Sequence, residues 1–186
     1  PVRALATSLE SGHALLQRGL PHRRCESGQR WSWDGVQFEL LHPGPADYLR
    51  ALKPNALSCV LRATDAEGTS VLLAGDIERA QEAALLAAHG QALASELLLV
   101  PHHGSRTSSS DDFLQAVAPK VALVQAGYRN RFGHPAPDVQ ARYRARGILL
   151  VRSDRCGAWT WSGGQAWCER ERGQRYWHAV DGLPAP

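Results

Sequence analysis

Several side chains that can bind a metal ion or move a proton follow short apolar segments of the chain. Asp76 comes directly after SVLLAG, His102 and His103 follow ELLLVP, and His134 ends the polar run after KVALVQAG. Carboxylate and imidazole groups serve both as metal ligands and as general acids or bases. The carboxyl ends of adjacent strands in an α/β sheet lie at one edge. We therefore expect Asp76, His102 and His134 to converge there.

Groups that suit a phosphate lie beside these residues. Ser105 opens the hydroxyl-rich run SRTSSS, and Arg129 and Arg131 lie just before His134. Hydroxyl groups and backbone N–H groups can cradle an oxyanion, and Arg binds phosphate through its planar fork. Each feature also has a structural interpretation. Asp76 alone is more typical of a helix N-cap, a single His is usually structural, and a Ser-rich run can be a flexible loop. Their combination favours a metal site.

The elements that position these residues can be read from the pattern of apolar residues. The segments WSWDGVQFELLHP and LSCVLRATDAEGTSVLLAGD each predict a β-hairpin. Helices are predicted over 77–89, from Ser110 to Pro119, and over 137–146, with short strands ELLLV, KVALVQAG and ILLVRS between and after them. Hairpins followed by alternating strands and helices predict an α/β fold with a mixed sheet.

The composition is that of a globular protein and excludes several other classes. The chain has 186 residues, of which 44% are hydrophobic and 21% charged. No apolar run reaches the roughly 18–20 residues that cross a bilayer, and the start, PVRALATSLESG, does not resemble a signal peptide. The chain contains no Met and opens with Pro1. We therefore expect it to be cut from a longer protein.

The charge is small but its make-up is uneven. The net charge is +3, and all but two of the 21 basic residues are Arg. Between Tyr128 and Arg155, seven Arg accompany two Asp, a local balance of +5. One interpretation is a solvated helix face rich in Arg. The other, equally favoured, is a surface for an anionic, phosphate-bearing partner.

Four Cys residues allow three disulfide pairings, and none has the spacing of a zinc ribbon. Cys156 and Cys168 flank the predicted hairpin GAWTWSGGQAW, so they can face each other across it. This leaves Cys25 with Cys59. We predict these two disulfides, which fit an oxidising compartment.

Three motifs in a fixed order give a specific resemblance. The runs GDIE, PHHGS and NRFGHP, with NALSCVL before them, resemble the metallo-β-lactamase-like domain of ComEC proteins, the DNA-uptake channels of competent bacteria. The resemblance covers roughly Arg24 to Asp154. It implies a metallo-β-lactamase-like αββα sandwich over 1–167, lacking the N-terminal part of its first half, and a C-terminal tail over 168–186. It also implies a periplasmic or extracellular domain of an inner-membrane protein.

The resemblance implies roles for particular residues. Asp76 matches a metal-bridging Asp, and the His after the next strand falls on His102 or His103. Two divalent cations, zinc or manganese, are implied, with Asp76 and His102 as ligands. His103 and His134 are the candidates that orient a phosphate oxygen or protonate the leaving group. The phosphate-binding candidates are Ser105, Arg129 and Arg131.

One part of the family pattern is missing from this chain. An HxHxDH or HxDxDH motif is expected in the first half of the fold, and no H-x-H or D-H occurs here. We therefore expect the chain to begin downstream of that motif and to be catalytically incomplete. Two or three ligands do not close a metal site, so we expect metal binding by this chain to be weak or absent.

Two functions from different classes follow. The first is a metal-dependent phosphodiesterase, a nuclease that degrades one strand of incoming DNA during natural transformation. The second is a non-catalytic domain that docks DNA or proteins of the competence machinery. The expected partners are DNA, the transmembrane channel portion of the same polypeptide and other competence proteins.

Overall fold

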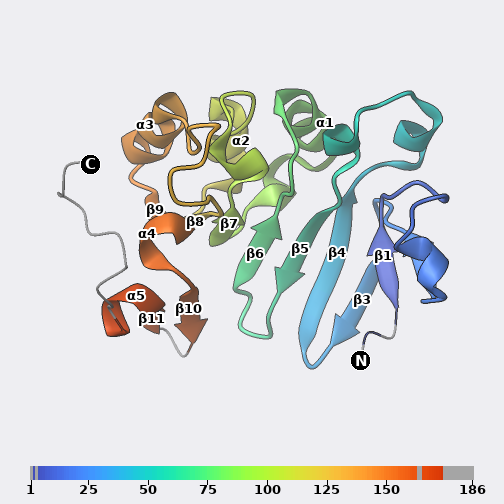
Figure 1. Cartoon of the computed structure of the whole chain (residues 1–186), viewed down its shortest axis with the longest axis horizontal. Coiled ribbons are helices and arrows are strands. Elements are labelled where there is room, and N and C mark those ends of the chain that lie inside the picture. The colour runs from blue at the N-terminus through green and yellow to red at the C-terminus, as the bar shows by residue number, and fades with distance from the viewer. Residues whose placement is uncertain (1, 3, 163–164, 174–186) are drawn as a thin grey trace.

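The main feature of the fold is a seven-stranded mixed sheet (Figure 1). The structure is a computed structural model that describes residues 2, 4–162 and 165–173. The sheet runs in chain order through β3 (Arg30–Trp33), β4 (Val36–His42), β5 (Val60–Thr64), β6 (Ser70–Leu73), β7 (Leu97–Leu99), β8 (Val121–Val124) and β9 (Leu149–Arg152). Strands β3 to β6 pair antiparallel, and β6 to β9 pair parallel. This confirms the predicted mixed sheet.

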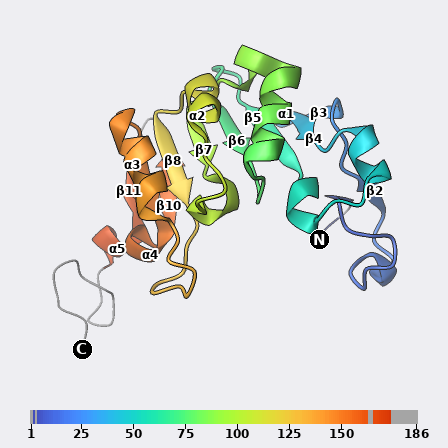
Figure 2. The same cartoon turned by 90° about the horizontal axis from the view of Figure 1, so that it is seen from above.

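Three helices cover one face of this sheet: α1 (Arg79–His89), α2 (Asp111–Val117) and α3 (Pro137–Ala145) (Figure 2). Because side chains alternate along a strand, Leu72, Leu98 and Ala122 share a face, and all three are fully buried. They form one apolar core with buried residues of the helices, such as Phe113 and Val139. The helices therefore fix the positions of the loops between the strands.

The opposite face of the sheet is apolar but only partly covered. Leu73, Leu99 and Leu123 lie on it at paired positions of β6, β7 and β8, and each is partly exposed. The described residues thus contain one helical layer and one large sheet of the expected αββα sandwich. Among them, no helix combines the length and the apolar character that crossing a membrane requires.

Two small sheets and two disulfides complete the described structure. Strands β1 (Leu5–Thr7) and β2 (His22–Arg24) pair parallel, and β10 (Trp159–Ser162) and β11 (Gln165–Cys168) form the predicted hairpin. Both predicted disulfides, Cys25–Cys59 and Cys156–Cys168, are confirmed. The second joins the end of β11 to the short helix α4 (Ser153–Cys156).

The expected tail over 168–186 is only partly described. After β11 the chain forms the short helix α5 (Glu169–Arg172), and residues 174–186 lie outside the described residues. The proposed division at 167 remains a prediction.

Candidate active site

The candidate residues come from the ends of three parallel strands. Asp76 follows β6, the segment 101–104 follows β7, and the segment 125–135 follows β8. The backbone N–H of His102 donates to the Gly75 carbonyl at 2.9 Å, which joins the first two loops. The N–H of Ala136 donates to the Gly104 carbonyl at 2.9 Å and joins the last two. The predicted convergence at one edge of the sheet therefore follows from parallel pairing plus these two backbone contacts.

Gly104 is the position where two of these loops touch. Its φ is +78°, and a Cβ built there would lie 2.6 Å from Cβ of Pro135. Only Gly tolerates both this conformation and this contact. The absence of a side chain at Gly104 therefore lets Pro135, and with it His134, approach the two His of the neighbouring loop.

His103 faces Asp76 across the site. Its Nδ1 lies 2.7 Å from the Gln125 carbonyl oxygen, so Nδ1 carries the proton that is donated there. Its Nε2 lies 3.5 Å from Oδ1 of Asp76. A nitrogen lone pair and a carboxylate repel each other unless a proton or a cation lies between them. The side chains of Asp76 and His103 are 41% and 48% exposed, so a substrate can reach them.

His102 lies in a different hydrogen-bonding environment from His103. Its Nε2 is 3.3 Å from the side-chain amide of Asn55, and its Nδ1 is 3.3 Å from Oε1 of Glu78 and 3.4 Å from the Thr107 hydroxyl. The structure thus brings His103, and not His102, next to Asp76. Glu78 and Asn55 belong to the site as neighbours of His102. The only signal for Glu78 in the sequence is its place in the GDIE run.

His134 completes the group of three imidazoles. Its ring centroid is 6.1 Å from that of His102, and its Nδ1 is buried without a hydrogen-bond partner among the described residues. Partial burial lowers the pKa of His134, and the nearby His102 and His103 lower it further. At neutral pH the ring is therefore uncharged and offers a lone pair, which suits a ligand or a proton acceptor better than a proton donor.

Ser105 is buried within its own loop. Its hydroxyl lies 3.1 Å from that of Thr107 and accepts a hydrogen bond from the Thr107 N–H at 3.4 Å. Ser105 therefore supports Thr107, which in turn contacts His102. The structure places Thr107, and not Ser105, beside an imidazole.

Arg129 and Arg131 lie on the exposed loop before His134. Within the part of the chain that the structure describes, no carboxylate is in salt-bridge range of either guanidinium. The other end of the Arg-rich region differs. Arg142 is only 17% exposed, pairs with Asp138 and donates to the Ser108 carbonyl. Arg142 is thus a structural residue, so the interpretation of the helix as a merely solvated Arg face does not hold for it.

A buried carboxylate anchors the hydroxyl-rich loop. Glu82 on α1 is fully buried and accepts hydrogen bonds from the backbone N–H groups of Ser109 and Ser110, at 2.5 and 2.8 Å. The Ser109 hydroxyl lies 3.0 Å from that of Tyr143 on α3. Burial raises the pKa of the Tyr143 phenol well above its usual range, and Glu82 adds to this shift. The loop after β7 is thereby tied to both helices.

Replacing Glu82 with Ala is expected to lower the free energy of unfolding by about 3 kcal/mol. The change leaves the buried N–H of Ser109 and the part-buried N–H of Ser110 without an acceptor, at about 1–3 kcal/mol for each fully buried group. Chemical denaturation monitored by circular dichroism measures the effect. Glu67→Ala, at an exposed turn position, should change stability by less than about 0.5 kcal/mol. Equal stability of the two variants would contradict the anchoring role.

The donor atoms of the site suit a divalent cation in type but not in number. Imidazole nitrogen and carboxylate oxygen are common ligands of zinc, and Nδ1 of His134 has no hydrogen-bond partner within the described part of the chain. Yet across residues 2, 4–162 and 165–173, no group of three or more His, Cys, Asp and Glu side chains is arranged to hold a metal ion. The described residues therefore do not complete a metal site by themselves.

Three curated relatives share most of the chain. The chain is 45% identical over 136 residues to competence protein ComA of Neisseria gonorrhoeae, covering 73% of this chain and 19% of that protein. It is 38% identical over 141 residues to an uncharacterized protein, YcaI, of Escherichia coli, covering 75% of this chain and 18% of that protein. It is 29% identical over 144 residues to ComE operon protein 3 of Bacillus subtilis, covering 77% and 18%. The chain thus spans less than a fifth of each relative.

Two solved structures resemble the chain in part, at low sequence identity. No protein-family model matches the chain. One is a protein of the metallo-β-lactamase superfamily from Thermotoga maritima, at 13% identity and a TM-score of 0.43, covering 81% of this chain and 80% of that one. The other is a metallo-hydrolase of Ignicoccus hospitalis, at 14% identity and a TM-score of 0.46, covering 82% of this chain and 62% of that one.

The expected α/β fold with a large mixed sheet is confirmed. The motifs that carry the resemblance also occupy one edge of the sheet in the structure. The similarity to named competence proteins completes the assignment, and the chain belongs to their family, the ComEC family, as a domain that corresponds to less than a fifth of the length of those relatives.

Proposed function

We propose that the chain is part of a metal-dependent phosphodiesterase that hydrolyses one strand of DNA during its uptake. The observation that supports this most directly is the clustering of Asp76, His103 and His134 beside Arg129 and Arg131. Hydrolysis of a phosphodiester requires proton transfer and neutralisation of charge on the phosphate. The cluster offers groups for both.

Each residue has a proposed part in this reaction. Asp76 contributes a metal-ligating carboxylate, and the histidine pair contributes an imidazole ligand, with His103 nearer to Asp76 than His102 is. The remaining ligands come from residues outside the described ones. A bound divalent cation supplies charge neutralisation and a more acidic water. His134 accepts a proton or a hydrogen bond, and Arg129 and Arg131 hold the phosphate. Ser105 positions Thr107 by hydrogen bonding, and Thr107 in turn contacts His102.

The proposed setting is a longer membrane protein. The chain would be its periplasmic or extracellular domain, next to a transmembrane channel portion of the same polypeptide. Its partners would be DNA and other competence proteins. The names of two relatives, a competence protein and a ComE operon protein, support this setting.

A second candidate function is a non-catalytic domain that docks DNA or competence proteins. The incomplete set of metal ligands among the described residues favours it. The two candidate functions differ in whether DNA is cleaved. Docking requires the exposed Arg residues for binding but no hydrolysis of the DNA.

The test compares the 186-residue chain with the longer protein that contains it. Each is purified, its metal content is measured, and it is incubated with end-labelled single-stranded DNA and zinc or manganese. We expect the chain alone to hold much less than one ion and to leave DNA intact, and the longer protein to degrade it. Intact DNA after incubation with a folded, DNA-binding longer protein would favour docking. A fully occupied two-metal centre in the chain alone would contradict the proposed sharing of ligands.

A further inference from the structure

The loop after β8 exposes two aromatic rings beside the candidate active site. Tyr128 is 57% exposed and Phe132 is 67% exposed, although large apolar side chains are usually buried. The exposed Arg129 and Arg131 lie between the two rings along the chain. Arg129 lies 5.3 Å from the centroid of the Tyr128 ring, and Arg131 lies 4.8 Å from that of Phe132.

The side chain of Asn130 and two backbone hydrogen bonds within the loop hold it in shape. The amide nitrogen of Asn130 donates to the carbonyls of Gly127 and His134 at 3.2 and 2.7 Å, and its amide oxygen accepts from the His134 N–H at 2.9 Å. The segment between Gly127 and His134 is therefore closed by its own hydrogen bonds. The exposed rings are presented by an ordered turn, so a ligand need not order the backbone when it binds.

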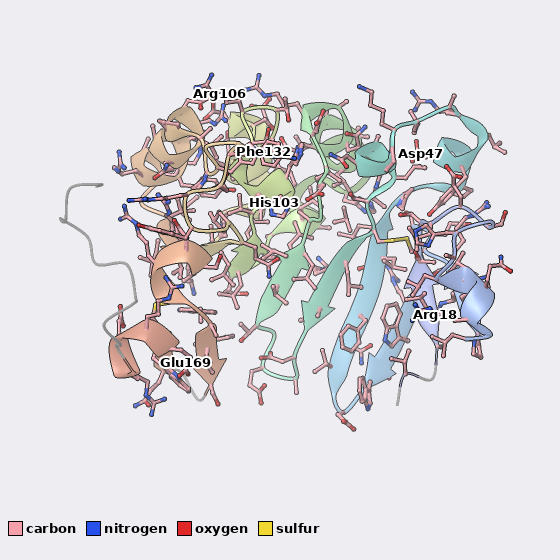
Figure 3. All side chains as sticks on the ribbon, viewed as in Figure 1. Arg18, Asp47, His103, Arg106, Phe132 and Glu169 are labelled. Atoms are coloured by element: carbon pink, nitrogen blue, oxygen red, sulfur yellow. A yellow bond between two sulfur atoms is a disulfide. The ribbon has the colours of Figure 1, made fainter. Side chains whose placement is uncertain are left out.

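The Phe132 ring lies directly against the site. Its centroid is 5.8 Å from that of His134 and the two rings are within 18° of parallel. His134 is in turn 6.1 Å from His102. Figure 3 shows Phe132 near His103 in the middle of the view, whereas Arg18 lies towards its right-hand edge. A flat group stacked on Phe132 would therefore lie one ring away from the histidines.

We propose that Tyr128 and Phe132 stack on unpaired bases of a single-stranded nucleic acid, while Arg129 and Arg131 contact its phosphates. This inference rests on the proposed function, which it narrows to a single-stranded substrate. Two aromatic rings with two cationic side chains between them offer stacking surfaces for the flat bases and positive charges for the phosphates of such a strand. In a duplex the base faces are covered by neighbouring bases, so the rings have nothing to stack on.

The Arg residues need not move far to act in this way. A guanidinium over an exposed ring gains little interaction free energy, because water screens the cation–π contact. A base stacks more strongly on an aromatic ring. A base that displaces Arg129 or Arg131 from its ring therefore frees that guanidinium for the adjacent phosphate.

The test measures binding of the 186-residue chain to two fluorescent strands of about ten nucleotides. One is oligothymidine, and the other is an abasic strand with the same sugar–phosphate backbone. We expect wild type to prefer oligothymidine. Tyr128→Ala with Phe132→Ala should weaken binding of oligothymidine about 10- to 100-fold and leave binding of the abasic strand unchanged. Tyr128→Trp with Phe132→Tyr should retain the preference.

Trp33 provides the matched control. It is 70% exposed at the β3–β4 turn, at the opposite end of the strands from the site, so Trp33→Ala should leave both affinities unchanged. Equal binding of the two strands by wild type, or an equal loss for both in the double variant, would overturn the proposal. So would a loss of binding to anionic phospholipid vesicles without a loss for oligothymidine. Because the assay measures binding without hydrolysis, its outcome is independent of whether the longer protein proves to be a nuclease.

Discussion

Asp76→Asn is expected to slow hydrolysis of single-stranded DNA by the longer protein about a thousandfold, because a carboxylate that would hold the catalytic cation is lost. Asn keeps the shape of Asp but removes its charge. The imidazole of His103 is fixed by the Gln125 carbonyl, so its Nε2 would face an amide 3.5 Å away instead of a carboxylate. The amide can donate to Nε2 and block it, and it is a poorer cation ligand. The loss should appear in single-turnover rates at saturating DNA.

The matched control is the same substitution at Asp34. Asp34 lies in the β3–β4 turn with a φ of 49°, a conformation that Asn also adopts readily. Asp34→Asn should leave the rate unchanged, and both variants should bind DNA as wild type does. If Asp76→Asn retains more than about a tenth of the activity, the loss is far smaller than that expected for a carboxylate that holds the catalytic cation, and the carboxylate has no role in the reaction.

The edge of the sheet at which the site forms could be predicted because it depends only on strand direction. Once β6, β7 and β8 are parallel neighbours, the residues after them must lie together. The identity of the His next to Asp76 could not be predicted in the same way. His102 and His103 both adopt left-handed backbone conformations, with φ of 48° and 55°. This conformation, which apolar periodicity does not encode, decides the direction of each ring.

Buried polar residues were the hardest to predict from the sequence. Glu82 lies in an Ala-rich helix pattern where a Glu is normally solvated, yet it is fully buried as the acceptor for two loop N–H groups. Arg142 has a local partner, Asp138, one helical turn away, but it also donates to the carbonyl of Ser108, which is 34 residues away in sequence. Such distant partners meet only after the helices pack on the sheet. Local spacing therefore contains no signal for them.

The hairpins and the disulfides, in contrast, could be predicted from the sequence. The turn at Asp34 and the hairpin between Cys156 and Cys168 involve residues close in sequence, so turn preferences and alternation suffice to predict them. The pairing of Cys25 with Cys59 then followed by elimination. Exposed aromatic residues in a loop, such as Tyr128 and Phe132, have no comparable local rule. Their functional role depends on which residues the fold places next to them.

Replacing Arg129 and Arg131 together with Ala is expected to change both the salt dependence of DNA binding and the rate of hydrolysis. Neutralising a phosphate releases condensed counterions. Each phosphate contact with a single strand therefore adds about 0.7 to the steepness of the plot of log affinity against log salt concentration. Losing two contacts should therefore reduce the slope by about 1–2 units. Binding of the 186-residue chain to labelled DNA over a salt series measures this change.

The same double variant in the longer protein should lose turnover more than binding. A guanidinium that stabilises charge developing on the phosphate contributes more in the transition state than in the bound ground state. Loss of one such donor typically slows an enzyme about 100-fold or more. The rate at saturating DNA should therefore fall by at least that factor, even where added protein compensates for weaker binding.

The control must remove the same charge without touching the site. Arg142 is unsuitable because it is partly buried and paired. Arg18 and Arg144 are exposed and lie on η1 (Leu16–Arg18) and α3, away from the strand ends that carry the site. Arg18→Ala with Arg144→Ala lowers the net charge equally and should leave the salt slope and the turnover near their wild-type values. Equal effects of the two double variants would mean that DNA responds only to net charge, and would remove Arg129 and Arg131 from the site.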